Sequence, residues 1–247
     1  MSNALLYMIQ MQLDARKLMM LAAESGMYRD EIDEGYYIHQ QIMEMFGKNV
    51  FQTFRVTNQN NRLITILAYS NLSAAQLRKQ AEEFASPGRY ECCRWETFAG
   101  KPMPDSWQSG QKYRFEVKTC PVVRISRNSS KLKKGAEIDA FLAAIDNSKT
   151  EDLSREQVYK TWLIDQFARF SAAKVEQISL VGFKRTRLLR RTQAKPRQIR
   201  VLERPEAHLK GKIQIQDSNK FTDFLIKGIG RHISFGFGMI LLKPEVE

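Results

Sequence analysis

The pattern of apolar and polar positions along this chain predicts one order of elements that occurs twice. Apolar residues alternate with polar ones over residues 5–13, which is typical of a strand with one buried face. Over residues 33–47 they recur at helical spacing instead, and we expect a helix that Asp33 opens and Gly47 ends. The chain therefore begins with a strand followed by a helix.

Two further strands and a second helix are expected next. The segments VFQTFRV (50–56) and LITILAYS (63–70) flank a polar turn, as the strands of a β-hairpin do. Ser73 is expected to cap a helix that stops at Pro87, and a fourth strand should run from Arg89 to about Phe98. This order, β-α-β-β-α-β, is that of ferredoxin-like domains.

The same order restarts after residues 100–110, a segment rich in Gly, Pro and Ser that we interpret as a linker. The later elements that we expect are a strand at 113–125, a helix with Tyr159, Leu163, Phe167 and Phe170 on one face, a hairpin at 183–201, a strand at 211–217, a helix at 218–228 and a strand at 238–243. The sequence thus predicts an α+β protein of two tandem ferredoxin-like (RRM-like) domains, residues 1–110 and 111–247, with a basic β-hairpin in the second.

Composition narrows the class of protein. With 247 residues, 43% of them hydrophobic, the chain is long enough for two cores of ordinary size. Cys92 and Cys93 are adjacent and Cys120 is distant, which matches neither a metal site nor a disulfide framework, so we expect a reducing cytoplasm. We expect neither export nor a membrane anchor, because no stretch approaches the ~18 apolar residues of a membrane span.

The positive charge is concentrated in the second half of the chain. Residues 1–110 hold 11 lysines and arginines against 12 acidic residues, a net charge of −1. Residues 111–247 hold 28 against 15, a net charge of +13, which accounts for the whole formal excess of +12. We therefore expect the second domain to bind a polyanion.

The segment FKRTRLLRRTQAKPRQIRV (183–201) carries eight basic residues and no acidic one. Its pattern on either side of residues 193–196 predicts a long β-hairpin with Pro196 at the turn. Such a ribbon fits a nucleic-acid groove, whereas solvated surfaces usually mix both signs of charge. The alternatives are a solvated basic face and an arm that touches acidic protein. The basic residues are Lys184, Arg185, Arg187, Arg190, Arg191, Lys195, Arg197 and Arg200.

His39 is the histidine best placed for acid–base chemistry. It lies three residues after Tyr36 in the first turns of the expected helix, so both side chains project from one side of it. The dipole at a helix start disfavours imidazolium and keeps a neutral base available near pH 7. The alternative is an ordinary half-exposed helix histidine. His208 is expected to be a loop or phosphate-contact residue, and since no two histidines have metal-ligand spacing, we expect neither a metal nor a cofactor.

The segment GIGRHISFGFG (228–238) is similar to a phosphate cradle. Its glycines permit positive φ and close backbone approach, and Arg231 and His232 are expected at its tip. It does not match the dinucleotide-binding fingerprint, because Ile233 stands in place of the third glycine. A tight helix-to-strand turn is the alternative, and it explains one pair of glycines better than four. The residues that carry this prediction are Gly228, Gly230, Arg231, His232, Gly236 and Gly238.

Over nearly its whole length the chain resembles the CRISPR-associated repeat-processing endoribonucleases of the RAMP superfamily, most closely the CasE branch of type I-E systems. GIGRHISFGFGMILLKP (228–244) looks like the glycine-rich loop and following strand of that superfamily. GYYIHQQIMEMFG (35–47) is similar to the family's first helix, in which a Tyr precedes the catalytic His by three residues; here these are Tyr36 and His39. Ile233 departs from the pattern, because many relatives have Lys or Arg there, and Arg231 or His232 would have to supply that phosphate contact.

The resemblance implies a metal-independent endoribonuclease that cleaves precursor RNA at the 3′ base of each CRISPR repeat hairpin. Attack by the 2′-OH would leave a 2′,3′-cyclic phosphate or 3′-phosphate end, with His39 transferring a proton and Tyr36 positioning the substrate or transferring a second proton. The product would stay bound within a type I, Cascade-like complex. Besides the hairpin, phosphate contacts are expected from Arg124, Arg127, Lys131, Lys133 and Lys134.

Two other functions remain open at this point. One is a catalytically silent RAMP subunit that binds an RNA hairpin without cutting it. The other is a housekeeping RNA-binding protein that reaches the same fold independently. Cutting of repeat RNA distinguishes the enzyme from both.

Overall fold

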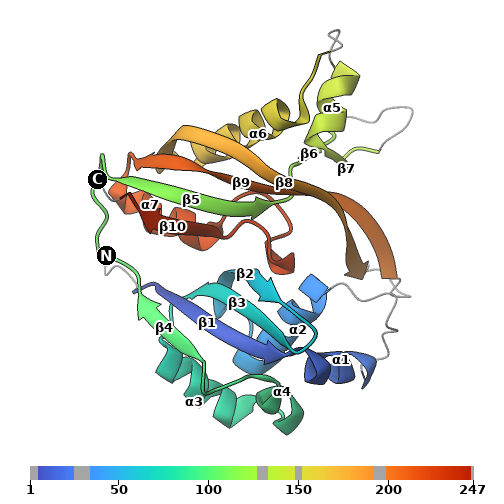
Figure 1. Ribbon diagram of the computed structural model, residues 1–247, viewed down its shortest axis with the longest axis vertical. Helices are drawn as coiled ribbons and strands as arrows, with labels where there is room; N and C mark the ends of the chain where they lie inside the picture. Colours follow the sequence, from blue (N-terminus) through green and yellow to red (C-terminus); the bar gives the residue numbers. More distant parts are fainter. Residues whose placement is uncertain (1–4, 25–33, 127–132, 148–151, 192–198, 246–247) are drawn as a thin grey trace.

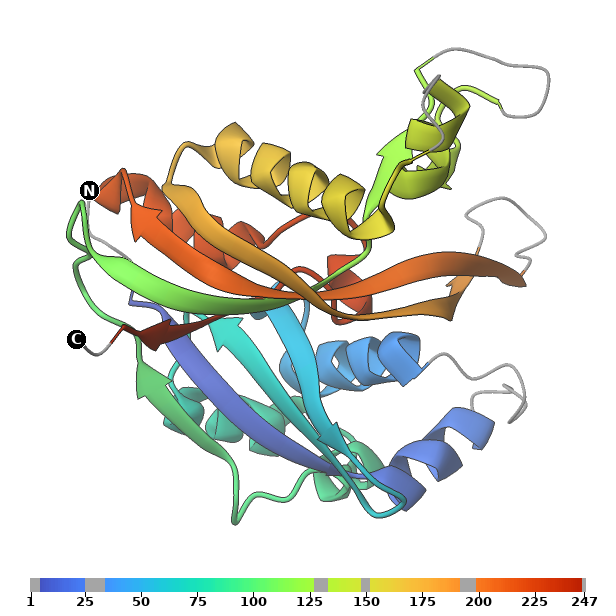
Figure 2. The same cartoon turned by 45° about the horizontal axis from the view of Figure 1, so that its top comes forward.

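The computed structural model describes residues 5–24, 34–126, 133–147, 152–191 and 199–245. Within these ranges the strands form two four-stranded antiparallel sheets and one small two-stranded sheet. The two large sheets lie one above the other, with helices α3 and α4 beneath the first and helix α6 above the second (Figure 1, Figure 2). The predicted α+β fold of two ferredoxin-like units is confirmed.

The first unit repeats the predicted order with two additional helices. Its sheet has the order β2-β3-β1-β4, and all neighbouring strands are antiparallel. Ile9, Met11 and Leu13 of β1 are buried against the helices, because alternate residues of a strand point to the same face. The elements are β1 (Tyr7–Asp14), α1 (Ala15–Glu24), α2 (Glu34–Phe46), β2 (Phe51–Gln59), β3 (Leu63–Ser70), α3 (Ala74–Phe84), α4 (Pro87–Cys92) and β4 (Ala99–Pro102).

The second unit has the corresponding strand order, β10-β5-β9-β8. Helices α6 and α7 supply Phe167 and Phe224, whose rings pack together with Phe115 of β5. A small extension, made of β6, β7 and α5, projects from this unit (Figure 2). The elements are β5 (Lys112–Thr119), β6 (Val122–Arg124), β7 (Glu137–Asp139), α5 (Ala140–Asn147), α6 (Arg155–Phe170), β8 (Ala173–Arg191), β9 (Ile199–Ile215), α7 (Ser218–Lys227), the 3-10 turn η2 (Ile233–Phe235) and β10 (Ile240–Pro244).

The two units are joined along β10, the edge strand of the second sheet that lies nearest the first (Figure 1). The Tyr69 hydroxyl of β3 donates a hydrogen bond to the Ile240 carbonyl at 2.8 Å, and burial raises the pKa of Tyr69. The Arg55 guanidinium of β2 pairs with Glu116 of β5, and Arg55 is only 6% exposed. These contacts are buried and directional, so they fix how the two units meet.

The expected fourth strand at Arg89–Phe98 is wrong. Residues 87–92 form helix α4, because Pro87 stands at the start of a helix, where its fixed φ and missing N–H are favourable. The Tyr90 and Trp95 rings then stack on each other with centroids 4.6 Å apart, instead of alternating across a sheet. The strand that closes the sheet is β4, which lies in the segment that we had interpreted as linker.

The basic hairpin is longer than expected and belongs to the second sheet itself. β8 and β9 pair from Ala173↔Ile215 to Arg191↔Ile199, so the strand expected at 211–217 is the last part of β9. The single strand expected at 113–125 is wrong: β5 ends at Thr119, and β6 pairs with β7 in a separate small sheet. The sequence pattern did not reveal α1, α5 or β7. Asp33 and the hairpin turn at residues 193–196 lie outside the described residues.

Candidate functional site

His39 lies where α2, β2 and the glycine-rich loop meet. Ile38 and Ile42 of α2 are buried in the first core, which turns His39 to the flank of the helix, where it is half-buried. Its imidazole stacks on the Phe54 ring of β2, with centroids 6.5 Å apart and planes inclined by 6°. Phe54 in turn touches the loop, because a Cβ added at Gly236 would lie 3.1 Å from its Cε2.

Burial lowers the pKa of His39 below its ordinary value of 6.5. The sequence predicted a neutral imidazole from the helix dipole, and the structure gives burial as the cause. At pH 7 the side chain is therefore mostly neutral, which is the state that a general base needs.

Tyr36 packs on the side of α2 that faces α1. Its ring meets the Tyr37 ring edge-on, with centroids 5.9 Å apart, and both residues pack with Ala22. Its aromatic contacts therefore differ from those of His39, although the two residues are three positions apart on one helix. A shared role of the two is still a prediction.

The loop at 228–238 has a conformation that requires glycine. Gly228, Gly230, Gly236 and Gly238 all have positive φ. The Gly238 carbonyl accepts a hydrogen bond from the Ile229 amide at 2.9 Å, and a Cβ on Gly238 would lie only 2.4 Å from the Ile229 carbonyl oxygen. The close backbone approach in this structure is that of the loop to itself, and the predicted cradle for a phosphate stays a prediction.

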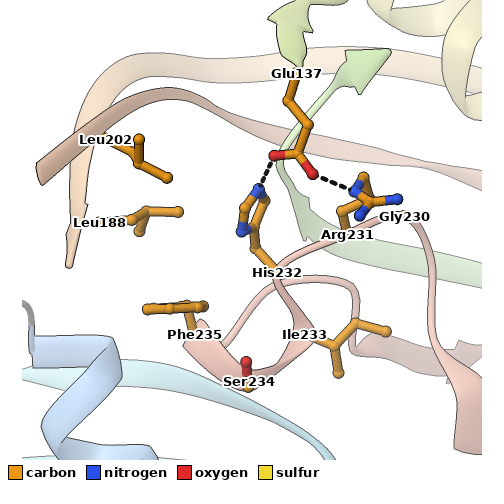
Figure 3. Close-up of a pocket in the computed structure, with 9 residues that line it drawn as sticks. All are labelled: Glu137, Leu188, Leu202, Gly230, Arg231, His232, Ile233, Ser234 and Phe235. Atoms are coloured by element: carbon orange, nitrogen blue, oxygen red, sulfur yellow. Dashed lines mark hydrogen bonds and ion pairs between the residues drawn. The ribbon is translucent and has the colours of Figure 1, made fainter. Parts of the chain in front are cut away.

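The side chains of Arg231 and His232 both contact a carboxylate of the small extension (Figure 3). Glu137 of β7 accepts hydrogen bonds from Arg231 Nε at 2.5 Å and pairs with His232 Nε2 at 2.9 Å. Arg204 Nη2 lies 3.5 Å from the same carboxylate. Both loop side chains are thus tied to Glu137, which weakens the expectation that they contact phosphate.

The charge states in this cluster follow from burial and pairing. Burial lowers the pKa of His232, although the nearby Glu137 carboxylate acts in the opposite direction. For Glu137 burial would raise the pKa, but His232 and Arg231 outweigh it and the pKa is lowered. The cluster near pH 7 is therefore an ionised carboxylate held by arginines and a mostly neutral imidazole.

A cleft of about 410 Å³ lies between the two units next to α2. Gly35, one turn before His39 on the same face of α2, lines it, and so does Phe235 of η2, the element against which α2 packs. The first unit also contributes residues 56–59. From the second unit come Lys118, Lys184, Thr186, Arg187, Leu188, Glu206, His208 and Phe237.

Cationic side chains outnumber acidic ones in the cleft. Glu206 is 5% exposed, and its carboxylate lies 3.4 Å from Lys184 Nζ and 3.2 Å from His208 Nε2. Burial would raise the pKa of Glu206, but the hydrogen bond with His208 and the charges of Lys118 and Lys184 lower it. A single carboxylate therefore faces several cations, which favours binding of a phosphate.

The structure places only some of the predicted basic residues. Arg187 is exposed at the cleft, whereas Arg185 pairs with Glu203 at 3.2 Å, across the hairpin. Arg124 on β6 is exposed, and so are Lys133 and Lys134 before β7. Arg127, Lys131, Lys195 and Arg197 lie outside the described residues, as do the side chains of Arg190, Arg191 and Arg200.

Several residues of this site were not predicted from the sequence. Lys118, Glu206 and Phe235 line the cleft, and Glu137 holds the loop. The sequence alternates Lys118 with the apolar residues of its strand, which predicts that Lys118 points away from the core. Only the fold shows that it faces the cleft.

The remaining candidates for chemistry are inert or absent in the described part of the chain. Burial raises the pKa of Cys92, Cys93 and Cys120 to about 12 in each case, so these thiols stay protonated and unreactive. The described residues contain no group of three or more His, Cys, Asp or Glu side chains placed to hold a metal ion. None of the described helices is long and apolar enough to span a membrane.

Comparison with known proteins gives one family and one fold. Residues 6–244 match the model of the family described as CRISPR associated protein. The structure of the CRISPR endoribonuclease Cse3 bound to a 19-nt RNA is similar, with 12% identity, a TM-score of 0.65, and coverage of 97% of this chain and 100% of that one. No curated protein matches the chain.

Two further structures share the fold. Cas6e from Escherichia coli str. K-12 has 18% identity and a TM-score of 0.57, over 96% of this chain and 99% of that one. A chain of a CRISPR RNA-guided surveillance complex has 14% identity and a TM-score of 0.58, over 96% and 99%. At sequence identities this low, the structural similarity establishes a common fold and nothing more.

Proposed function

Because the chain belongs to the family of CRISPR-associated proteins, we propose that it is an endoribonuclease that binds the CRISPR repeat stem-loop and cleaves the precursor RNA at the 3′ base of the hairpin. The observation that carries this proposal is the mostly neutral imidazole of His39, which lies one helical turn from Gly35 in the wall of a cation-lined cleft. The fold, shared with an endoribonuclease bound to RNA, supports it.

The residues of the site fit cleavage by the 2′-OH of the RNA without a metal. His39 takes the proton of the 2′-OH, whose oxygen attacks the phosphorus in line as the bond to the 5′-oxygen breaks. The 5′-oxygen takes a proton from solvent water as it leaves, and the product end is a 2′,3′-cyclic phosphate or, after hydrolysis, a 3′-phosphate. Lys184 and Arg187 stabilise the negative charge that develops on the phosphate oxygens, and Tyr36 positions the substrate.

Recognition of the RNA combines charge and shape. The β8–β9 ribbon is two strands wide and extends past the body of the second unit (Figure 2). Its basic side chains supply affinity through phosphate contacts. A regular A-form major groove is too deep and narrow to be read easily, so the ribbon contacts the backbone or enters at a widened end of the stem.

The cleaved RNA stays bound in a larger assembly in the cytoplasm. A chain of the same fold is part of a CRISPR RNA-guided surveillance complex, which supports a type I, Cascade-like complex as the destination. An enzyme that cuts each RNA once and keeps the product needs no rapid turnover.

Arg187→Ala is expected to weaken RNA binding and to reduce its dependence on salt. Loss of one phosphate contact should make the slope of log K against log salt concentration shallower by about 1. The measurement is the dissociation constant for repeat hairpin RNA over a series of salt concentrations. Lys79→Ala, on the outer helix α3, is the matched control and should leave the slope unchanged. Equal slopes for wild type and Arg187→Ala would remove this residue from the phosphate contacts.

The pH dependence of cleavage should report the lowered pKa of His39. A general base must be neutral, so the rate falls only as the pH drops through the pKa of His39, which lies below 6.5. The rate at limiting enzyme concentration, measured between pH 5 and 8, should therefore lose half its value at a pH below 6.5. A rate that instead falls as the pH rises through this region would make His39 the general acid.

The function is tested by single-turnover cleavage of a repeat hairpin RNA from the host's own array in excess EDTA. One discrete cut at the base of the hairpin supports the proposal. Tight binding without a cut would favour a silent RNA-binding subunit. Absence of binding, together with preference for ribosomal RNA, would favour a housekeeping RNA-binding protein.

A further inference from the structure

A second cavity, of about 480 Å³, lies next to the cationic cleft. The two cavities share Leu188 of β8 and Phe235 of η2, which form the wall between them. An RNA strand with a phosphate in the cleft would bring its neighbouring nucleotide towards this shared wall. The second cavity is therefore within reach of the same strand.

One side of this cavity is apolar. Leu188 and Leu202 lie directly opposite each other on β8 and β9, and Figure 3 shows both side chains along one side of the cavity. Phe235 lies below them, and its half-buried ring meets the His232 ring edge-on with centroids 5.9 Å apart. A flat apolar ligand can contact both the leucine pair and the phenylalanine ring.

The other side is polar but does not favour phosphate. The ionised Glu137 carboxylate is hydrogen-bonded to both Arg231 and His232, and His232 is mostly neutral. A phosphate here would face the Glu137 carboxylate and compete with it for Arg231, whereas Arg187 is exposed at the cleft. Ser234 adds a hydroxyl group to the lining. The cavity thus combines groups that form hydrogen bonds with the apolar surface of the leucine pair and Phe235.

We propose that this cavity binds one unpaired nucleobase of the RNA, next to the phosphate held in the cleft. The base stacks on Phe235 and packs against Leu188 and Leu202, while its polar edge faces Ser234 and the Glu137–His232 pair. Single-stranded bases are recognised in this way, by stacking on aromatic rings together with hydrogen bonds to their edges. The proposal rests on the proposed function, because it names how the same RNA is read beside the cut.

The test uses repeat hairpin RNAs in which one unpaired nucleotide beside the hairpin base is made abasic, one position at a time. For the wild-type protein, one abasic position should raise the dissociation constant by about fivefold or more, the effect of losing one stacked base. For Phe235→Leu, the intact RNA and that abasic RNA should bind equally well, because the stacking partner is already absent. Phe84→Leu, at an exposed site on α3, is the control and should keep the wild-type preference.

The outcomes separate this inference from the function on which it rests. If the wild type binds and cuts the hairpin but no abasic position weakens binding, the cavity does not take a base and the inference fails alone. The same conclusion follows if the penalty of the abasic position persists in Phe235→Leu, because the base then lies elsewhere. If the wild type does not bind the intact hairpin, the proposed function and this inference fail together.

Discussion

His39→Ala is expected to lower the rate of cleavage of bound repeat RNA by about 10²–10⁴-fold, the usual contribution of a positioned general base. Binding should change little, because His39 lies on the first unit, whereas the cations of the cleft come from the second. Single-turnover cleavage at saturating protein in excess EDTA measures the rate. A binding assay on the same RNA measures affinity separately.

His39→Gln distinguishes proton transfer from packing. The His39 ring stacks on Phe54, which touches the loop at Gly236, so alanine also removes a structural contact. Glutamine fills much of the same space without an ionisable group, and it should lose as much activity as alanine. If His39→Gln cleaves at nearly the wild-type rate, His39 acts through packing, and the base must be sought among the residues that line the cleft.

Tyr36→Phe provides the comparison on the same helix. It keeps the ring that packs edge-on against Tyr37 and removes only the hydroxyl group. A hydroxyl that positions the substrate should cost less than the base itself, so we expect a smaller loss of rate than for His39→Ala. An equal loss would make the tyrosine a second proton-transfer group.

Gly238→Ala is expected to destabilise the protein by at least about 3 kcal/mol. Gly238 has φ +81°, which an L-residue adopts only with strain, and its new Cβ would lie 2.4 Å from the Ile229 carbonyl oxygen. That oxygen belongs to the backbone and cannot rotate away, so the loop has to open. Urea-induced unfolding measures the loss, and cleavage should fall with it because the loop carries Phe235 at the cleft.

Gly110→Ala is the matched control for this substitution. Gly110 has nearly the same φ, +87°, but no atom lies within 4 Å of an added Cβ. It should cost only about 1–2 kcal/mol, the ordinary penalty of a left-handed conformation. Equal losses for the two variants would show that backbone strain alone, and not contact with Ile229, makes glycine necessary at 238.

The parts of the fold that follow from local pattern were predicted correctly. The alternation on β1 and the helical spacing on α2 and α7 each reflect one face of an element turned to a core. A fourth strand was predicted at 89–98 because aromatic residues such as Tyr90 and Trp95 are common in strands. The prediction is wrong because Pro87 starts a helix there and the two rings stack on each other. The division of the chain at residue 110 stays a prediction.

The net charge of the basic hairpin cannot be predicted from residues 183–201 alone, because acids outside this segment pair with it. Residues 183–201 contain no acid, but strand pairing places Glu206 directly opposite Lys184 and Glu203 directly opposite Arg187, and Glu203 forms its ion pair diagonally with Arg185. These acids lie just outside the segment along the chain and directly across the ribbon in space. Part of the predicted charge is therefore neutralised. Arg187 is the better candidate for a phosphate contact because it is exposed at the cleft, while Glu203 is engaged by Arg185.

The sequence by itself determined the two ferredoxin-like units, the position of His39 on the first long helix and the need for glycine in the loop, because each depends on residues close together in the chain. Only the tertiary structure decided what these features meet. Glu137 holds His232, 95 positions away, and Phe54 of strand β2 stacks on His39 of helix α2. A side chain's pKa, its partners and the cavity that it lines depend on neighbours in space, and those neighbours are set by how the two sheets pack together.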